Sequence, residues 1–484
     1  MTRVLPISLH DTQVVRHNAT GWWLDEAGTV EPLAALDGTV DADVVVIGGG
    51  YTGMWTAWHL LEAGAKVALL EGGVCGHGPS GRNGGFCESM WLSGPSLRER
   101  FGDGPARALL DASSDSVTFI GDWCDSQGVD AWFDQSGYMC VSTAPAFDDV
   151  GREAVAAAAA LGAPHRMIDL TGEVRARCDS ALFRRGVLIP DFATLQPARL
   201  ALGLRRRLVE RGALVFERSR VKRLARGAAA PAAGRPGGVL AETAGGRVQA
   251  GAAVLAMGAA ARALRELRGR LTVTSSHIVL TEPVPDVIEE IGWTGGECIT
   301  DGRTLLHYFR TTPDHRILLG WGGGRLAYGS RLDGRVEVDP EIAAETHAAL
   351  LRLFPALAGR RITHAWGGPI DVSPSHIPQI GTLPGAPVHF AFGFTGNGVG
   401  PTQMAARALA SLALDRRDEH SRLPIVDAGP GALVPPEPLT WLGGSVVRSA
   451  LIRKERTAEN GDRADPLTRA ICAAPRALGM HLGR

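Results

Sequence analysis

The chain has 484 residues, of which 45% are hydrophobic and 21% charged, a composition typical of a folded globular protein and not of a disordered one. Its formal net charge of −1 gives no reason to expect binding to nucleic acid or to a membrane surface. No apolar run approaches the roughly 18 residues that span a bilayer, and the first residues lack a secretory signal, so we expect a cytoplasmic protein of two domains.

The first predicted unit follows an N-terminal extension of residues 1–39. Residues 43–47 (DVVVI) are typical of a buried parallel strand, residues 54–65 of a helix and residues 66–70 of a second strand. The turn between the first strand and the helix reads GGGYTG, a G-x-G-x-x-G fingerprint in the context that it requires.

This fingerprint predicts a dinucleotide site, with the pyrophosphate at the helix N-terminus. The first glycine permits the tight turn, the second a close approach of the backbone to the pyrophosphate, and the third close packing of helix on strand. A carboxylate about 20 residues further on would accept the ribose hydroxyls. The predicted contacts are Gly48, Gly50, Tyr51, Thr52, Gly53 and Glu71.

The next loop, residues 80–85 (SGRNGG), makes the pattern specific. The whole run 48–86 resembles the N-terminus of the D-amino-acid oxidase / glycine oxidase superfamily of FAD-dependent oxidoreductases, most closely its γ-glutamylputrescine oxidoreductase branch. The resemblance covers most of residues 40–425. It implies that this loop packs along the ribityl chain and rings of FAD, with Ser80, Arg82, Asn83 and Gly84 as contacts.

The middle of the chain continues this pattern. We predict a helix over 196–210, a strand over 213–226, a loose hairpin tip over 226–239 and a returning strand over 247–258. The resemblance implies that the backbone of Val221 contacts the adenine and that the segment ending at Gly258 closes over the dinucleotide.

A second strand, glycine turn and helix follow near the end of the family pattern, at 389–393, 394–401 and 402–415. Pro401 suits the first turn of the helix. The resemblance implies that this turn faces the pyrimidine edge of the flavin, where the helix dipole would stabilise negative charge on the reduced ring. The predicted contacts are Gly396, Asn397, Gly398, Val399 and Gly400.

These elements predict an α/β fold with a discontinuous Rossmann-like FAD-binding domain, formed by residues 40–91, 186–271 and 361–427. Residues 92–185 and 272–360 contain strand-like runs rich in aromatic residues, which suit a substrate domain built on an antiparallel sheet. Residues 428–484 form a C-terminal tail. We expect the tail to pack on the protein or to make an oligomer contact, in preference to lying on a membrane.

The resemblance implies oxidation of a C–N bond in an amine or amino acid, by hydride transfer to flavin N5, followed by hydrolysis of the imine. Strand alternation places Tyr308 and Arg310 on one face and His307 on the other, and all three are candidate catalytic residues. Arg310 could clamp a carboxylate or form a surface salt bridge. Trp366 resembles a family position beside the flavin.

Two departures from the family pattern concern the flavin. In the sarcosine oxidase branch a cysteine near the counterpart of Trp366 tethers the flavin, but residues 366–370 (WGGPI) contain none, so we predict non-covalent FAD. That branch also has two lysines near the flavin. Here one counterpart is Gly400, and Lys66, Lys222 and Lys454 lie elsewhere. Whether O2 or another acceptor takes the electrons therefore stays open.

Other functions also stay open. A flavin monooxygenase would need an NAD(P)H site, and no second complete fingerprint occurs. A non-catalytic FAD-binding partner subunit could use the tail for docking, and a homo-oligomer is not excluded. The seven scattered cysteines predict neither a disulfide framework nor a bound metal.

Overall fold

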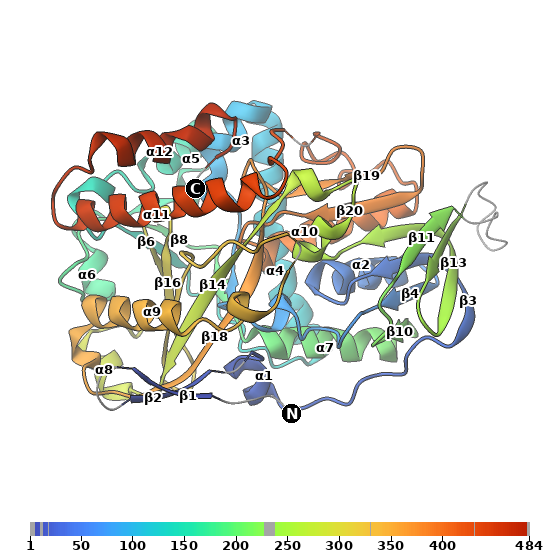
Figure 1. Ribbon diagram of the computed structural model, residues 1–484, viewed down its shortest axis with the longest axis horizontal. Coiled ribbons are helices and arrows are strands. Elements are labelled where there is room, and N and C mark those ends of the chain that lie inside the picture. The colour runs from blue at the N-terminus through green and yellow to red at the C-terminus, as the bar shows by residue number, and fades with distance from the viewer. Residues whose placement is uncertain are drawn as a thin grey trace.

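The computed structural model describes residues 5–9, 13–17, 19–226, 238–329, 331–429 and 431–481. Most of the predicted hairpin tip at 226–239 lies outside these residues. Two sheets dominate the described part of the chain, and they lie side by side in Figure 1.

The first sheet has eight strands, and its centre is parallel. β3 (Gly38–Ile47) lies between β4 (Val67–Leu70) and β13 (Gly246–Leu255), both parallel to it, and β20 (Val388–Phe392) is parallel to β13. The last four side chains of β3, residues 44–47, are buried on both faces, which explains their unbroken β-branched run. The remaining strands are β10 (Leu214–Phe216), β11 (Arg223–Arg226), β12 (Val239–Glu242) and β19 (Gln379–Thr382).

The strand predicted over 213–226 is interrupted between β10 and β11. The interruption follows the burial of Glu217, whose carboxylate accepts hydrogen bonds from Arg205 Nε at 2.7 Å and from the Cys75 N–H at 2.8 Å. These bonds turn the chain away from the sheet.

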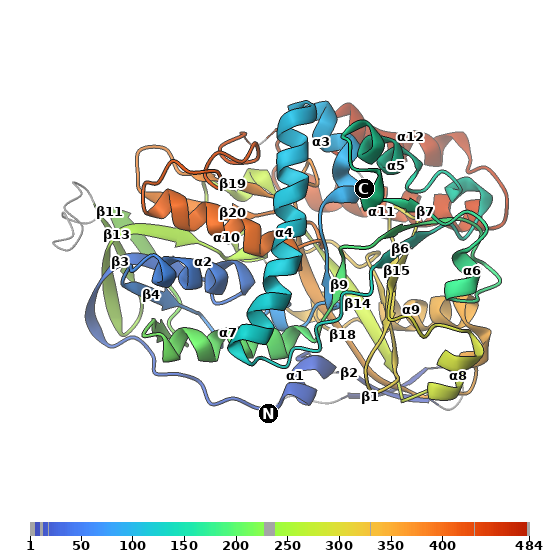
Figure 2. The ribbon, with the colours of Figure 1, turned by 180° about the vertical axis from the view of Figure 1, so that it is seen from behind.

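Three predicted helices are confirmed: α2 (Tyr51–Glu62), α7 (Pro197–Glu210) and α10 (Val399–Ala413). α2 and α10 each begin three residues earlier than predicted, because the glycine turns lead directly into helix. α10 packs on both α2 and the long helix α4 (Asp103–Gln127). Figure 2 shows α4 running along the boundary between the two halves of the molecule.

The second sheet has ten strands in the order β1-β2-β18-β14-β17-β16-β15-β6-β8-β7. It is antiparallel except where β2 meets β18 and β6 meets β15, so the predicted fold class is confirmed. Its strands are β1 (Leu5–Leu9), β2 (Gln13–His17), β6 (Tyr138–Val141), β7 (Ile168–Asp169), β8 (Gly186–Ile189), β14 (Thr272–Thr281), β15 (Cys298–Asp301), β16 (His307–Thr311), β17 (Ile317–Trp321) and β18 (Ile362–Val372).

Some strands join this sheet from ranges that were expected elsewhere. β8 and β18 lie in the ranges 186–271 and 361–427, which were expected to belong to the FAD-binding domain, and β1 and β2 come from the N-terminal extension. β18 pairs with β14 along almost its whole length. That long ladder fixes β18 in the ten-stranded sheet, here called the substrate sheet after its predicted role, while the chain after it returns to the eight-stranded sheet.

Segments near both ends of the chain pack on the half of the molecule that contains the ten-stranded sheet. α1 (Trp22–Ala27) buries Trp22 and Trp23 in one cluster with Trp366. α11 (Leu439–Glu459) and α12 (Pro466–Ala477) lie across the front of the ten-stranded sheet in Figure 1. Other elements are α3 (Gly94–Phe101), α5 (Arg152–Ala160), α6 (Val174–Arg177), α8 (Pro285–Glu290), α9 (Pro340–Leu353), β5 (Phe86–Cys87) and β9 (Ala193–Thr194).

Among the described residues, no helix is both long enough and apolar enough to cross a bilayer.

Candidate functional site

A cavity of about 1450 Å³ is lined by residues from both sheets. Pockets for small ligands usually measure about 300–1,000 Å³, so this one has room for a dinucleotide together with a small substrate. Its wall includes the glycine turn after β3 from the first sheet and residues of strands β14, β16 and β18 from the second.

The glycine turn after β3 forms one end of the cavity. Gly48 has φ +113°, and a Cβ atom there would lie less than 3.0 Å from the Ala256 carbonyl. Gly48, Gly50, Tyr51 and Thr52 line the cavity. Gly53 does not: its Cα faces the Gly48 carbonyl, where a Cβ would collide, so it allows helix and turn to touch.

The N-terminus of α2 faces this end of the cavity, and its N-cap residue Gly50 provides no side-chain cap. The helix dipole, together with the N–H groups of the first turn other than that of Tyr51, suits a pyrophosphate. Glu71 follows β4 and lines the cavity, and its carboxylate accepts from the N–H groups of Gly49 at 2.7 Å and Gly73 at 2.6 Å. Because each oxygen can accept a further bond, Glu71 also fits the ribose hydroxyls. Val221 and Gly258 line the same end.

The loop 80–85 is shaped by its own side chains. Ser80 Oγ accepts from the Tyr51 N–H at 2.9 Å, and Asn83 Oδ1 accepts from the Gly85 N–H at 2.8 Å. Arg82 donates to the Ala19 carbonyl at 2.6 Å and to Glu337 at 3.0 Å. Ser80, Arg82, Asn83 and Gly84 all line the cavity. The structure therefore brings the predicted loop contacts beside the predicted pyrophosphate site.

The glycine turn before α10 lines the same cavity, through Gly396, Asn397, Gly398 and Val399. The N-terminus of α10 also has no side-chain cap. Gly400 does not line the cavity, because it packs against the Glu88 carbonyl, where a Cβ would not fit.

Asp371, at the end of β18, orders this turn and was not predicted from the sequence. Its Oδ2 accepts from the Gly393 N–H at 2.6 Å, and its carbonyl accepts from the Thr395 N–H at 3.0 Å. Burial raises the pKa of Asp371 to about 6. The motif reading missed it because an aspartate at the end of a strand has no characteristic spacing.

Tyr308 and Trp366 lie on the substrate side of the cavity. The Tyr308 hydroxyl bonds Ser276 Oγ at 2.8 Å, and its ring packs against Gly84 and Gly320, neither of which has room for a Cβ. Burial raises the pKa of Tyr308, so the phenol is neutral. Trp366 Nε1 donates to the Arg82 carbonyl at 2.8 Å.

Arg310 and His307 do not line the cavity, although the strand alternation is as predicted. Arg310, only 1% exposed, donates to the carbonyls of Gly85 at 3.0 Å and Leu195 at 2.7 Å. Burial lowers its pKa to about 10. The expectation that Arg310 clamps a carboxylate is therefore wrong, because Arg310 is buried away from the cavity and its Nε and Nη1 are held by the backbone carbonyls of Thr311, Gly85 and Leu195. His307 Nδ1 bonds Asp301 at 2.6 Å and supports the β15–β16 turn.

The C-terminal tail supplies part of the cavity wall, which sequence reasoning did not foresee. One face of α11 lines the cavity through Leu439, Thr440, Gly443, Gly444, Val447, Arg448 and Leu451. The sequence of α11 does contain apolar and small residues at a helical spacing of four. This spacing predicts an amphipathic helix, but it does not show which surface the helix covers.

A nucleotide turn of this kind, two helix N-termini converging on one cavity and an antiparallel sheet over them define a dinucleotide-dependent oxidoreductase of two-sheet architecture. The chain belongs to the FAD dependent oxidoreductase family, which it matches over residues 43–412. The predicted family and its FAD cofactor are thereby confirmed, and α11 and α12 lie beyond the matched residues.

Individual relatives agree with this assignment. The chain is 27% identical over 431 residues to the probable oxidoreductase OrdL of Rhizobium meliloti (strain 1021), covering 86% of this chain and 91% of that one. It is 27% identical over 415 residues to the γ-glutamylputrescine oxidoreductase of Escherichia coli (strain K12), covering 84% and 92%. The fold is similar to that of glycine oxidase from Geobacillus kaustophilus, with a TM-score of 0.64, 20% identity, and coverage of 78% and 96%.

The cavity fits FAD in shape and chemistry. The residues near Val221 and Gly258 would hold the adenosine part, the N-terminus of α2 the pyrophosphate, and the loop 80–85 with the turn before α10 the flavin. Gly48 packs against the Ala256 backbone, and Gly84 and Gly320 pack against the Tyr308 ring, so a side chain at any of the three would displace a group that shapes the cavity.

Proposed function

We propose that this protein is an FAD-dependent enzyme that oxidises a C–N bond in a small amine or amino acid. One observation carries the proposal: a single cavity joins the dinucleotide turn at Gly48 to the aromatic wall formed by Tyr308 and Trp366. The names of the relatives, a γ-glutamylputrescine oxidoreductase and a glycine oxidase, support the choice of an amine or amino acid.

FAD held in this cavity would supply the acceptor for the hydride that leaves the amine-bearing carbon, and water would convert the resulting imine to a carbonyl compound and an amine or ammonia. The protein positions the substrate and excludes water from it. Ile278, Leu326 and Ile370 make this part of the cavity apolar. An apolar wall disfavours an ammonium ion and favours the neutral amine, which has the lone pair that assists loss of hydride.

Tyr308 contributes orientation and not proton removal. Its buried, neutral phenol can hold a polar group of the substrate through its hydroxyl, while Ser276 holds that hydroxyl in place. Trp366, fixed by its bond to Arg82, closes the wall beside the loop 80–85. The N-terminus of α10 supports negative charge on the reduced cofactor.

Finer features belong to the same proposal. We infer non-covalent FAD, supported by the fact that no cysteine occurs among the described residues that line the cavity. We place the protein in the cytoplasm, supported by seven cysteines that are all free thiols. O2 or another electron acceptor reoxidises the flavin, and a homo-oligomer is compatible with the exposed outer face of α11.

The decisive experiment is anaerobic addition of amines and amino acids to the purified holoprotein, with the flavin absorbance as the readout. Bleaching by one class of amine establishes C–N oxidation, and the rate of recolouring in air separates an oxidase from a dehydrogenase. Flavin that no amine bleaches would contradict the proposal. Bleaching by NAD(P)H would favour a monooxygenase, and no reduction by either would favour a partner subunit.

The variant Tyr308→Phe separately tests the role of the Tyr308 hydroxyl in orienting the substrate, because it keeps the ring and removes only the hydroxyl. We expect flavin reduction to slow about tenfold, as for loss of one hydrogen bond to the substrate, with unchanged FAD content.

A further inference from the structure

Helix α11 lies against the substrate part of the cavity at close range. Its lining residues recur every four positions, which places them on one face. A glycine allows the helix to approach: a Cβ on Gly444 would lie less than 3.0 Å from Leu326, which is itself a lining residue. The wall that α11 forms therefore helps to decide which substrates fit.

We propose that Arg448 on this wall is a specificity-determining residue, which binds a carboxylate group of the amine substrate. The inference rests on the proposed function and deepens it, because it names the substrate class as an amine that also carries a carboxylate. It also assigns the anion clamp to a helix beyond the residues that match the family.

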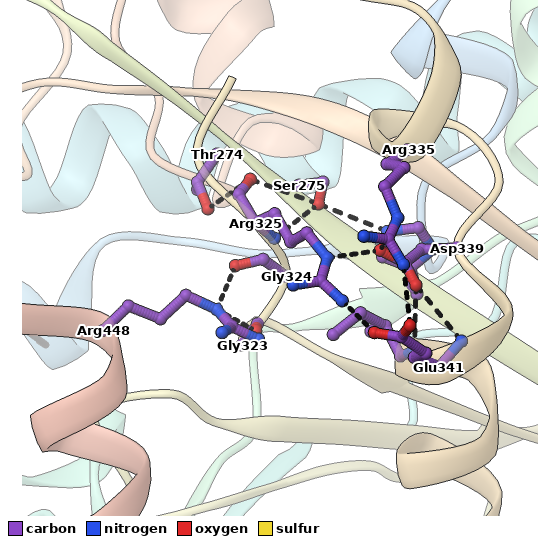
Figure 3. Close-up of polar contacts among 11 residues, drawn as sticks. Thr274, Ser275, Gly323, Gly324, Arg325, Arg335, Asp339, Glu341 and Arg448 are labelled. Carbon is purple, nitrogen blue, oxygen red and sulfur yellow. Dashed lines mark hydrogen bonds and ion pairs between the residues drawn. The ribbon is translucent and has the colours of Figure 1, made fainter. Parts of the chain in front are cut away.

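The guanidinium of Arg448 is held in place through its Nε, while its two terminal nitrogens are available to a ligand. Its Nε donates to the carbonyls of Gly323 and Gly324, both at 2.8 Å (Figure 3). These bonds fix the plane of the guanidinium and leave its two terminal nitrogens for a ligand. A guanidinium with two terminal donors in one plane matches a carboxylate bidentately.

Within the described residues, no carboxylate forms an ion pair with Arg448. The arginines around it are already paired: Arg325 and Arg335 both bind Asp339 and Glu341 (Figure 3). The other arginines on the cavity wall are also engaged or distant. Arg82 pairs with Glu337, and Arg220 and Arg223 flank Val221 at the adenosine end.

Burial of a charge without a counter-ion costs free energy, and Arg448 bears that cost. Burial lowers the pKa of Arg448, and the positive charge of Arg325 acts in the same direction, while the charges of Glu345 and Asp339 oppose this only in part. An arginine nevertheless stays protonated, so a substrate carboxylate would relieve both effects.

Arg448 is connected to the reacting part of the cavity through a short chain of contacts. The carbonyls that it holds follow Trp321 at the end of β17. The Trp321 carbonyl accepts from Ser276, which bonds Tyr308, and Tyr308 packs on Gly84 of the flavin loop. A substrate with its amine near Tyr308 would direct a carboxylate along this path to Arg448.

α11 is also anchored firmly enough to hold a ligand group. Glu455 accepts from the N–H groups of Thr304 at 2.8 Å and Leu305 at 3.1 Å, and both of these residues line the cavity. Arg303 joins Asp301 of β15 to Glu459 of α11.

The test compares the holoenzyme with Arg448→Ala, Arg448→Lys and the control Arg453→Ala. Arg453 lies on the same helix, with its side chain 71% exposed and paired with Asp465. Binding of benzoate and of its neutral analogue benzamide is measured by calorimetry. Flavin reduction is then measured with pairs of amines that differ only in a carboxylate, such as phenylalanine and phenethylamine or 4-aminobutyrate and butylamine.

We expect Arg448→Ala to weaken benzoate binding about 10- to 100-fold and to remove the preference for the carboxylate-bearing amine, with no change for benzamide. Arg448→Lys should recover part of the loss, which shows that the effect is not misfolding, and Arg453→Ala should match the parent. Equal binding of benzoate and benzamide by the parent, or an unchanged preference in Arg448→Ala, would overturn the inference. Failure of every amine to reduce the parent flavin would instead refute the proposed function.

Discussion

The indole Nε1 of Trp366 donates a hydrogen bond of 2.8 Å to the carbonyl oxygen of Arg82. This bond joins β18 of the substrate sheet to the loop that is expected to border the flavin. On its other side Trp366 packs against Gly21, where a Cβ would not fit, and Arg82 reaches the Ala19 carbonyl. The N-terminal segment, the substrate sheet and the flavin loop are thus tied together at one point.

Trp366→Phe should therefore loosen the flavin loop. The change removes the donor and leaves the buried Arg82 carbonyl without this partner, at a cost of about 1–3 kcal/mol. We expect FAD affinity to fall about 5- to 100-fold, measured by fluorescence titration of the apoprotein. Trp321→Phe is a matched control, because it removes a similar bond to the Leu305 carbonyl from a residue outside the cavity lining. An equal loss of FAD affinity in both variants would contradict this reading.

Gly53→Ala should disrupt the nucleotide turn. A Cβ at this position meets the Gly48 carbonyl, which is backbone and cannot move aside without opening the turn. We expect loss of several kcal/mol of stability and little bound FAD after purification. Gly104→Ala in α4, where nothing lies within 4 Å, should be neutral or up to about 1 kcal/mol stabilising. Retention of normal FAD content by Gly53→Ala would show that the turn tolerates displacement.

Arg310→Ala should lower stability without changing substrate preference. Its guanidinium serves the carbonyls of Gly85 and Leu195 and not the cavity. We expect a loss of about 3 kcal/mol in chemical denaturation, because two buried carbonyls lose their donor. The preference between amines with and without a carboxylate should stay as in the parent, in contrast to Arg448→Ala. A selective loss of activity on carboxylate-bearing amines would contradict this prediction and indicate that Arg310 binds the substrate carboxylate.

We expect the stability of the protein to depend on pH through Glu455 in the C-terminal tail. Burial raises the pKa of this side chain, 5% exposed, to about 7, and the negative charge of Asp301 adds to the effect. The folded state therefore holds a proton that the unfolded chain releases near pH 4.3. The stability contributed by this group is present below about pH 4 and is lost as the pH rises through 7, by up to about 3 kcal/mol.

Glu455→Gln cannot release the proton and should remove this loss. We expect its stability relative to the parent to increase steadily between pH 5 and 8, measured by denaturation with tryptophan fluorescence. Glu419→Gln, whose side chain is 85% exposed, is the control and should show no trend. Parallel pH profiles for Glu455→Gln and the parent would mean that the Glu455 carboxylate is already ionised at pH 5.

Local sequence patterns were informative wherever one segment forms a complete unit. The strand, glycine turn and helix around Gly48 could be read directly, because Gly53 meets the Gly48 carbonyl within the same unit and Gly48 meets Ala256 just after an adjacent strand. The turn before α10 was predicted from the same order of strand, glycine turn and helix. Alternation along β16 also placed Tyr308 and Arg310 on one face, but it did not reveal that only Tyr308 reaches the cavity.

The family, the FAD cofactor and the nucleotide turn could be predicted from the sequence alone, because these depend on residues close together in the chain. Features that depend on packing between distant segments emerged from the folded structure. It placed β18 in the substrate sheet, buried Arg310 against carbonyls of residues 85 and 195, and laid α11 over the cavity with Arg448 facing inward. The spacing of α11 showed an amphipathic helix, but which surface an apolar face covers is set by the shape of its partner and not by its own periodicity.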